Sequence, residues 1–299
     1  MSGPRLQTAV GTNQGAFGPS EWALLAVTAS IWGSSFLWIA IGLDDLHPGT
    51  VALSRLVVGG LTLWTLPSAR QPVGREAWLP IVIIGIVGSA GPALLFAFAE
   101  ERIESGVAGM IQAATPLVVL AISIVMLKKA PGSTQLLGLA VGFAGSVLLA
   151  WPSLAGSDAA PAGVAFAGLA LVGYGISSNI LPPVVQRYGA PAVVLRSLVV
   201  ATFVMAPYGL FGLTQSTFTW TAALAMLILG VFGTGLARNF FAQLIARAGA
   251  PRASLVSYIV PIVAVSLGIV FREETVSTIE LSGLAVVLFA ALLISRRQT

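Results

Sequence analysis

The sequence predicts an all-α integral membrane protein with ten transmembrane helices, arranged as two inverted five-helix repeats. Apolar residues make up 57% of the 299-residue chain and charged residues only 9%, against about 25% in soluble domains. Continuous apolar stretches, close to the roughly 20 residues that a transmembrane helix requires, fill almost the whole chain. The second half of the chain also repeats the first. Because the apolar runs are continuous, they do not fit the alternating pattern of a transmembrane β-barrel.

Each copy contributes five apolar stretches. In the first copy, residues 21–152, they are Trp22–Leu43, Pro48–Leu66, Trp78–Phe98, Gly106–Leu127 and Gln135–Trp151. In the second copy, residues 162–297, they are Ala162–Leu181, Val193–Leu213, Ala222–Ala246, Ser254–Phe271 and Leu281–Ile294. The last stretch is short, and Arg296 and Arg297 are expected to extend its reach by snorkelling. Residues 1–20 lack the apolar core of a cleavable signal, so we expect a disordered cytoplasmic tail.

The basic residues indicate the membrane orientation. Only Arg102 and Arg272 fall in loops on the side opposite the N-terminus, where most acidic residues gather. The other side carries Arg5, Arg70, Arg75, Lys128, Lys129, Arg187, Arg247, Arg252, Arg296 and Arg297. The positive-inside rule therefore predicts that both termini are cytoplasmic. Because the basic residues sit at alternate helix ends and form no single patch, we expect no nucleic-acid partner.

The internal repeat is clearest between Thr115–Val141 and Val260–Val286, which match at an offset of 145 residues. The aligned pairs include Pro116 with Pro261, Gly138 with Gly283 and, at a slightly smaller offset, Arg55 with Arg196. Since each copy crosses the membrane an odd number of times, the second copy is inverted. Inverted repeats are typical of secondary transporters, whose binding site lies between the copies near the bilayer midplane.

Composition excludes several kinds of site. The chain has no Cys and one His, so disulfides, thiolate metal sites and a histidine metal cluster are excluded, and no cofactor is expected. A membrane-embedded enzyme needs an acid–base pair, a nucleophile dyad or a metal cluster at membrane depth. None is visible, so no catalytic residue is assigned. A channel lacks the expected rings of charge.

Three segments carry a family resemblance: WGSSF at Trp32–Phe36, the arginines of SRL and LRS, and GAPRASLVSYIVPIVAV at Gly249–Val265. With these motifs the chain resembles the ten-helix EamA-type branch of the drug/metabolite transporter (DMT) superfamily. The resemblance extends from Trp22 to Arg297. It implies export of small metabolites from the inner membrane of a bacterium, with amino acids, including aromatic ones, and organic cations as typical cargo.

Polar and aromatic side chains on the helix faces suggest a substrate pocket. Aromatic walls with a few fixed donors suit a zwitterion with an apolar side chain, and ring faces also attract cations. Because Ser joins membrane helices and Trp or Tyr marks the interface, a packing role stays open for each residue. The candidate substrate-binding residues are Trp32, Ser35, Trp38, Phe96, Gln112, Thr115, Tyr174, Ser177, Ser178, Arg238, Ser257 and Tyr258.

Three arginines fall within predicted spans, where a charge costs at least about 2.5–3.5 kcal/mol. Arg196 lies near the end of its stretch and is expected to snorkel, whereas Arg55 lies nearer mid-span and is expected to brace the bundle. Arg238 aligns with Ala93 and has the strongest claim to bind a substrate carboxylate, although a purely structural role stays open. No Asp or Glu is expected inside a helix, so the sequence predicts a facilitator.

Pro and Gly residues on the helices suggest hinges, and static packing explains them equally well. The candidates are Gly88, Pro92, Pro116, Gly233 and Pro261. The sequence thus predicts a monomeric transporter that exports amino acids or similar metabolites through a central cavity by alternating access. Its expected partners are the lipid bilayer and a small-molecule substrate. A multidrug or organic-cation exporter is the alternative, which the arginines disfavour because a bare cation would lack a counter-charge.

Overall fold

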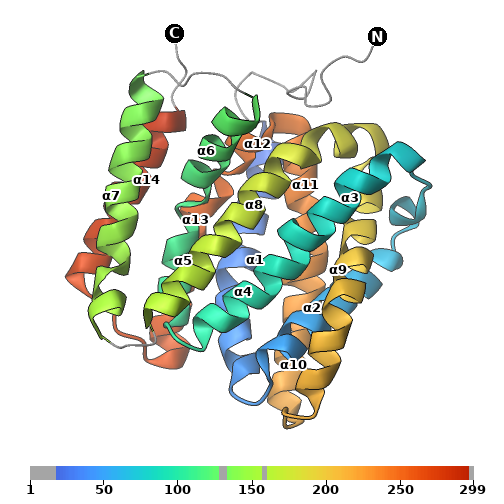
Figure 1. Cartoon of the computed structure of the whole chain (residues 1–299), viewed down its shortest axis with the longest axis horizontal. Helices are drawn as coiled ribbons and strands as arrows, with labels where there is room; N and C mark the ends of the chain where they lie inside the picture. The colour runs from blue at the N-terminus through green and yellow to red at the C-terminus, as the bar shows by residue number, and fades with distance from the viewer. Residues whose placement is uncertain (1–17, 128–132, 157–159, 296–299) are drawn as a thin grey trace.

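The computed structural model describes residues 18–127, 133–156 and 160–295, and the regular elements among them are all helical (Figure 1). The first copy contains α1 (Pro19–Leu43), α2 (Pro48–Trp64), α3 (Trp78–Gly85), α4 (Gly91–Glu100), α5 (Ser105–Gln112), α6 (Thr115–Leu127) and α7 (Ser133–Gly156). The second contains α8 (Ala160–Tyr188), α9 (Ala190–Leu213), α10 (Trp220–Ile228), α11 (Ala237–Ala248), α12 (Ala250–Ala253), α13 (Val256–Arg272) and α14 (Thr278–Ser295). The 3₁₀ segments η1 (Pro67–Arg70) and η2 (Arg75–Ala77) connect α2 to α3. The π-helical segments η3 (Ile86–Ala90) and η4 (Leu229–Leu236) join α3 to α4 and α10 to α11.

The predicted all-α membrane class is confirmed at the level of long apolar helices. Within the described residues, six helices are long and apolar enough to cross a membrane: Pro19–Leu43, Arg75–Glu100, Ser105–Met126, Ala160–Tyr188, Ala190–Leu213 and Trp220–Ala248. Val256–Arg272 and Thr278–Ala290 are apolar but shorter. Each predicted stretch coincides with one helix or with consecutive helical segments. A crossing by all ten stays a prediction.

Some predicted features fall outside the described residues. They are residues 1–17 of the expected tail, the basic pair Lys128 and Lys129, and the expected snorkelling pair Arg296 and Arg297.

Glycine makes the tight turns between successive helices in the second copy. α8 continues past the predicted end at Leu181, through two prolines, to Tyr188. Gly189 alone separates it from α9, and Gly249 alone separates α11 from α12, each with a φ of 80°. Because a Cβ is disfavoured at positive φ, glycine permits these one-residue turns.

The helices of the two copies interleave rather than forming separate bundles. α2 packs against α9 and η4, α1 against α13, and α4 against α8. The last helices of the copies, α7 and α14, pair at one edge of the molecule, while α2, α9 and α10 lie toward the opposite edge (Figure 1). The buried core therefore lies between the copies, where a site shared by both can form.

Close backbone approach makes this interleaving possible. A Cβ on Gly33 of α1 would lie 2.5 Å from the Cβ of Val263 on α13, and one on Gly85 would lie 2.8 Å from the carbonyl oxygen of Ser197 on α9. Membrane helices associate through such small-residue contacts, because lipid removes the hydrophobic force that drives packing in water.

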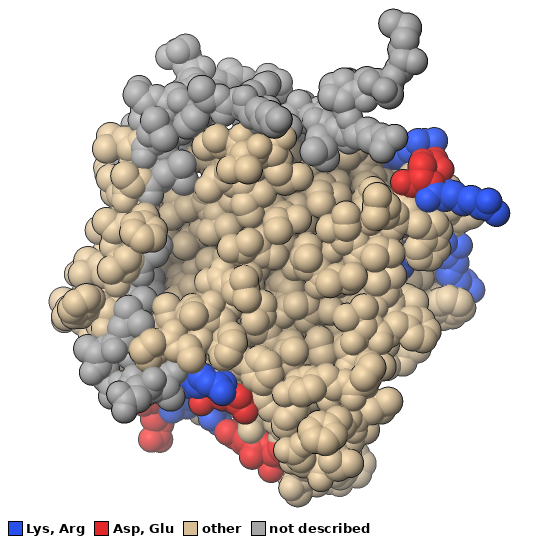
Figure 2. All heavy atoms as spheres, viewed as in Figure 1, with Lys and Arg blue, Asp and Glu red and all other residues tan. Residues whose placement is uncertain are grey.

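The charged side chains gather at two ends of the molecule, with an uncharged band between them on the face shown in Figure 2. Arg187 pairs with Glu76 at one end, where the nitrogen–oxygen distance is 2.9 Å. At the other end Arg272 pairs with Asp44 at 2.6 Å. This distribution suits a protein whose apolar middle lies in lipid.

Candidate functional site

Two π-helical segments interrupt helices that correspond in the two copies. At the 145-residue offset, Gly88 of η3 falls on Gly233 of η4. A π-helical turn changes which backbone N–H bonds to which carbonyl, and such turns occur frequently at functional sites. Neither segment was predicted from the sequence, although the shared Gly-Ser and Gly-Thr pairs at this offset were a usable signal.

In η3, the carbonyl of Gly88 receives a bond from the other copy. Pro92 has no N–H to donate to this carbonyl four residues earlier, which is where an α-helix would place the bond. Instead, Nη2 of Arg238 on α11 donates to the carbonyl oxygen of Gly88. The proline that the sequence suggested as a hinge thus leaves an acceptor that a guanidinium group from the second copy uses.

In η4, the carbonyl of Gly233 is also reached from the opposite copy. The N–H of Ala237 donates five residues back, to Phe232, rather than to Gly233. Nε1 of Trp32 on α1 donates to the Gly233 carbonyl oxygen at 3.1 Å. The Trp32 ring also packs against Phe241 of α11, with ring centroids 4.8 Å apart.

The residue after each glycine offers a hydroxyl, and both hydroxyls accept from arginines across the interface between the copies. Nη1 of Arg238 donates to Oγ of Ser89 at 2.8 Å. Nε of Arg55 on α2 donates to Oγ1 of Thr234 at 2.9 Å. Hydrogen bonds to charged groups contribute about 1.5–3 kcal/mol, comparable with the minimum cost of placing the charge in the membrane. These bonds therefore explain how both arginines are tolerated.

The two glycines are also packing positions, as the sequence suggested. A Cβ on Gly88 would clash with the Oγ of Ser177 on α8 and lie 2.5 Å from the Cβ of Ser177. A Cβ on Gly233 would lie 2.6 Å from Oγ of Ser35 on α1. Ser35 and Ser177 correspond in the repeat, so each serine packs against the π-helical segment of the other copy.

Aromatic rings line one side of this cluster. The Phe36 and Phe96 rings meet edge to face with centroids 5.4 Å apart, and Phe96 stacks on Tyr174 at 6.1 Å. Tyr174 is an electrostatic neighbour of both Arg55 and Arg238. Two cations, hydroxyl groups and aromatic faces therefore gather where the two copies meet.

The structure brings together about half of the predicted binding residues. Those in the cluster are Trp32, Ser35, Phe96, Tyr174, Ser177 and Arg238, together with the hinge candidates Gly88, Pro92 and Gly233. Among the described residues, no hydrogen bond or ring contact joins the other candidates to it. These are Trp38, Gln112, Thr115, Ser178, Ser257 and Tyr258, of which Trp38 and Tyr258 are half-buried and the rest buried.

The proline candidates of the fourth and ninth stretches lie elsewhere on these helices. Pro116 is at the start of α6, after the break that follows α5, where Thr115 donates to the carbonyl of Gln112 at 2.6 Å. Pro261 lies inside α13. A hinge role for either stays a prediction.

Arg196 and Arg55 correspond in the repeat but have different surroundings. Arg196 donates to the carbonyl oxygens of Ala69 and Gln71, in the connection after α2, at 3.1 and 2.6 Å. Its side chain thus reaches the helix end, whereas Arg55 is 8% exposed and is bonded inside the bundle.

The expectation that no acidic residue lies inside a helix is wrong. The third stretch was predicted to end at Phe98, but α4 continues to Glu100, and both carboxylate oxygens of Glu100 are buried without a hydrogen bond. The charged run Glu100–Arg102 resembles a loop in sequence, yet its first residue completes the helix. The prediction of a facilitator rested on the absence of such an acid and loses that support.

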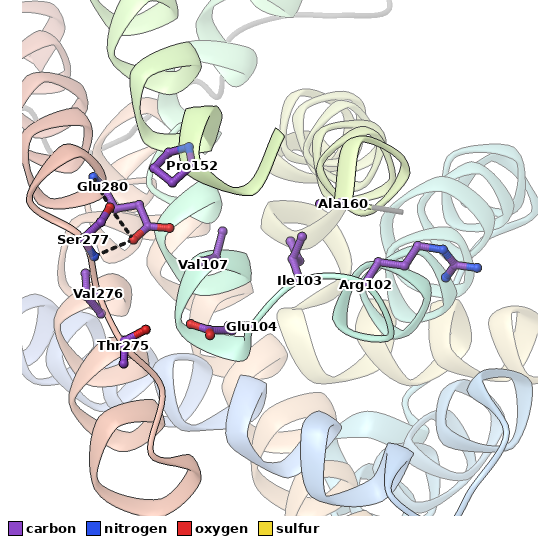
Figure 3. Close-up of a pocket in the computed structure, with 10 residues that line it drawn as sticks. All are labelled: Arg102, Ile103, Glu104, Val107, Pro152, Ala160, Thr275, Val276, Ser277 and Glu280. Carbon is purple, nitrogen blue, oxygen red and sulfur yellow. Dashed lines mark hydrogen bonds between the residues drawn. The ribbon is translucent and has the colours of Figure 1, made fainter. Parts of the chain in front are cut away.

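A cavity of about 400 Å³ lies between the segment around the start of α5 and the segment that precedes α14 (Figure 3). Its lining begins at Arg102, two residues after Glu100. Glu280 accepts hydrogen bonds there from the backbone N and Oγ of Ser277, at 2.7 and 2.8 Å. Burial, together with repulsion from Glu274 and Glu280, raises the pKa of the Glu104 carboxyl above its ordinary value. The guanidinium group of Arg102 points away from Glu280 in Figure 3. The cavity contains none of the predicted binding residues.

Comparisons with known proteins agree with the division into two copies. Residues 20–151 and 161–296 each match the model of the EamA-like transporter family. The inner membrane transporter YedA of Escherichia coli (strain K12) is 26% identical over 275 residues, covering 89% of this chain and 87% of that protein. A protein of Streptantibioticus cattleyicolor named as a probable terminal-alkyne amino-acid exporter is 26% identical over 284 residues, covering 92% and 93%.

A solved crystal structure shows the same fold. It aligns with a TM-score of 0.66 and 18% identity, covering 92% of this chain and 96% of the other. Together with the two matched segments, which span most of the chain, these likenesses identify the protein as a multi-pass membrane transporter. The chain belongs to the EamA-like transporter family of the DMT superfamily.

Proposed function

We propose that the protein exports amino acids or closely similar metabolites across a bacterial inner membrane by alternating access. Arg238 carries this proposal. Its guanidinium group is half-buried and is held by neutral acceptors, the Gly88 carbonyl and the Ser89 hydroxyl. Among the described residues, no carboxylate forms an ion pair with Arg238 or Arg55. A permanent charge that lacks an anionic partner suits the carboxylate of a substrate.

The aromatic side of the cluster supports an apolar side chain on that substrate. Phe96 stacks on Tyr174, which is an electrostatic neighbour of both arginines, and aromatic walls with a few fixed donors are typical of small-molecule sites. The relative named as a probable amino-acid exporter, similar over most of both chains, supports the same substrate class.

The contacts between the copies support alternating access. Arg238 and Trp32 each join one copy to the π-helical segment of the other. In our proposal, a substrate carboxylate replaces the neutral acceptors of Arg238, and the helices that carry η3 and η4 then separate. Kinks in helices occur at Pro and π-helical turns, and both features are present at η3.

The membrane arrangement is part of the proposal. We propose ten crossings in two inverted copies, residues 21–152 and 162–297, with both termini cytoplasmic and the chain acting as a monomer. The charge bias of the loops supports this orientation.

An organic-cation exporter is the second candidate. The carboxylates of Glu104 and Glu280 beside the cavity favour it, since they would attract a cation. The cluster between the copies disfavours it, because two arginines that form no ion pair would repel a cation from the central site.

Counterflow in proteoliposomes tests the choice. Vesicles loaded with unlabelled phenylalanine should exchange labelled phenylalanine saturably, whereas a labelled pyridinium dication should not exchange. Arg238→Ala should lower the exchange roughly tenfold to a hundredfold, the equivalent of about 1.5–3 kcal/mol for a charge-assisted bond. Arg247→Ala is the matched control, because Arg247 is exposed and pairs with Glu21 at the helix ends. Saturable exchange of the dication alone would overturn the proposal.

A further inference from the structure

The carboxylate of Glu100 has no role in the transport cycle proposed above. Both of its oxygens are buried and neither has a hydrogen-bond partner. The other described side chains in this condition are those of Thr28 and Asn239, which do not ionise. Among the described residues, Glu100 is thus the ionisable side chain that combines full burial of its polar atoms with the lack of a partner.

The charged groups near Glu100 form their hydrogen bonds with other residues. Its electrostatic neighbours are Arg55 on α2, Arg272 at the end of α13, and Glu274 just beyond it. Arg55 donates through Nε to the neutral hydroxyl of Thr234, so its positive charge remains a neighbour of Glu100 without a hydrogen bond to it. Arg272 forms two bonds to Asp44, at 2.6 and 2.9 Å.

Glu274 is engaged in capping α5. Its carboxylate accepts from the backbone N and Oγ of Ser105, at 2.9 and 2.5 Å, and from the backbone N of Gly106 at 2.8 Å. It therefore adds a negative charge near Glu100 and donates no hydrogen bond to it.

The remaining elements that pack against α4 add no cation beside Glu100. α8 contributes Tyr174, which stacks on Phe96 one helical turn before Glu100. α5 begins after Glu104, another acidic residue. α1 ends at Leu43, next to Asp44, which is already paired with Arg272. Arg55 and Arg272 attract a negative charge on Glu100, but neither forms a hydrogen bond or ion pair with it. Because both oxygens are closed off from solvent and lack a donor, burial favours the neutral acid.

We propose that Glu100 is a proton-binding site of this transporter, occupied in the conformation described here and emptied when that end of the bundle opens to water. The proposal rests on the assignment to a transporter family and deepens the proposed function, because it supplies an ion that can be coupled to substrate movement. Carboxylates inside membrane spans commonly serve as proton relays.

The step is a proton transfer without any redox change. On closure, an O–H bond forms between one Glu100 oxygen and a proton delivered by water at the membrane edge, leaving hydroxide or a buffer anion in solution. On opening, that bond breaks and the proton returns to water. Water then solvates the carboxylate, so a higher pH on that side favours the open form.

Infrared difference spectroscopy of the protein in lipid tests the site without any substrate. The wild type minus Glu100→Gln difference should contain the carbonyl band of a protonated carboxylic acid at pH 7, well above the usual glutamate pKa of about 4.3. Glu101→Gln should lack this difference band, because Glu101 is exposed and pairs with Arg102. A carboxylate band for Glu100 at pH 7 would overturn the proposal, whatever the substrate proves to be.

A cysteine reporter tests the link to opening, and the chain contains no cysteine of its own. Val107 lines the cavity at this end and is 3% exposed. In Val107→Cys, labelling by an impermeant maleimide, corrected for the pH dependence of the thiol with a fully exposed cysteine, should rise severalfold between pH 6 and pH 8. The rise should vanish when Glu100→Gln is added and persist with Glu100→Asp. Equal labelling at both pH values in all three backgrounds would show a static buried acid and overturn the proposal.

Counterflow and infrared spectroscopy together separate the failure of this inference from the failure of the proposed function. Counterflow of phenylalanine reports substrate choice and needs no pH gradient, whereas the infrared band reports only Glu100. Phenylalanine exchange together with an ionised Glu100 would leave the exporter standing without this proton site. A protonated Glu100 in a protein that exchanges only the dication would support the proton site and overturn the proposed substrate class.

Discussion

The two π-helical segments present the same acceptors but meet different donors. Each offers a glycine carbonyl followed by a hydroxyl, and each is contacted by the opposite copy. At η3, Arg238 alone bonds both acceptors. At η4, two side chains share them, since Trp32 bonds the carbonyl and Arg55 the hydroxyl. The acceptors have kept the repeat symmetry and the donors have not.

This difference suggests that the two segments have different roles in transport. Arg55 is 8% exposed and Thr234 is 1% exposed, so their contact belongs to the buried core. Arg238 is less buried, and its two bonds depend on the position of a single side chain. A substrate that draws Arg238 away would release both acceptors of η3 in one movement, whereas η4 would keep its contacts with Trp32 and Arg55. The comparison suggests that η3 is the moving contact and η4 the fixed one.

The largest expected effect comes from giving η4 the proline of η3. Pro92 corresponds to Ala237 at the 145-residue offset. In Ala237→Pro, the bond from Ala237 to Phe232 is lost and the ring meets the preceding turn, so the free energy of unfolding should fall by about 3 kcal/mol. Unfolding in mixed detergent micelles measures this change. Pro92→Ala is the matched control and should change stability by much less, because η3 already functions without that donor.

Removing the hydroxyl acceptor should lower stability more at η4 than at η3. Thr234→Val removes the hydrogen-bond acceptor of a buried guanidinium group and keeps the side-chain shape, so it should cost about 1.5–3 kcal/mol of stability. Ser89→Ala should cost less, because the Gly88 carbonyl still accepts from Arg238. Equal losses in the two variants, measured in the same unfolding assay, would contradict the assignment of η4 as the fixed contact.

The glycines allow a finer test of packing. In Gly88→Ala, the new Cβ meets both Oγ and Cβ of Ser177, and the Cβ of a serine cannot rotate away. Overpacking of this kind costs about 1–3 kcal/mol. In Gly233→Ala the close atom is the Ser35 hydroxyl at 2.6 Å, which can change rotamer, so the loss should be smaller. A larger loss of stability for Gly233→Ala than for Gly88→Ala in thermal unfolding would contradict this prediction.

The sequence predicted those parts of the fold and site that depend on composition and repeat spacing. Apolar length located the helices, and the repeat paired Gly88 with Gly233 at an offset of 145 and Ser35 with Ser177 at an offset of 142 before any contact was known. It also singled out Arg238 as an arginine without a counterpart.

The parts that escaped prediction depend on hydrogen-bond partners, which spacing does not determine. Apolar content does not distinguish a π-helical turn from an α-helical one, and the repeated Gly-Ser and Gly-Thr pairs mark a shared position without showing which donors reach it, so the acceptors at Ser89 and Thr234 were missed. Glu100 was assigned to a loop because it begins a charged run, whereas burial by neighbouring helices decides its environment. Charge in the sequence shows that a residue can ionise, and only its surroundings decide whether it does.

The smallest expected effect tests whether Trp32 contributes to the fixed contact through its donor or through its ring. Trp32→Phe removes the Nε1–H that bonds to Gly233 and keeps an aromatic ring near Phe241. A typical hydrogen bond contributes about 0.5–1.5 kcal/mol, so stability should fall by that amount, with exchange of phenylalanine almost unchanged. A loss of exchange without a loss of stability would place Trp32 among the substrate contacts. The two segments would then each release a donor during transport, and the division between a moving η3 and a fixed η4 would no longer hold.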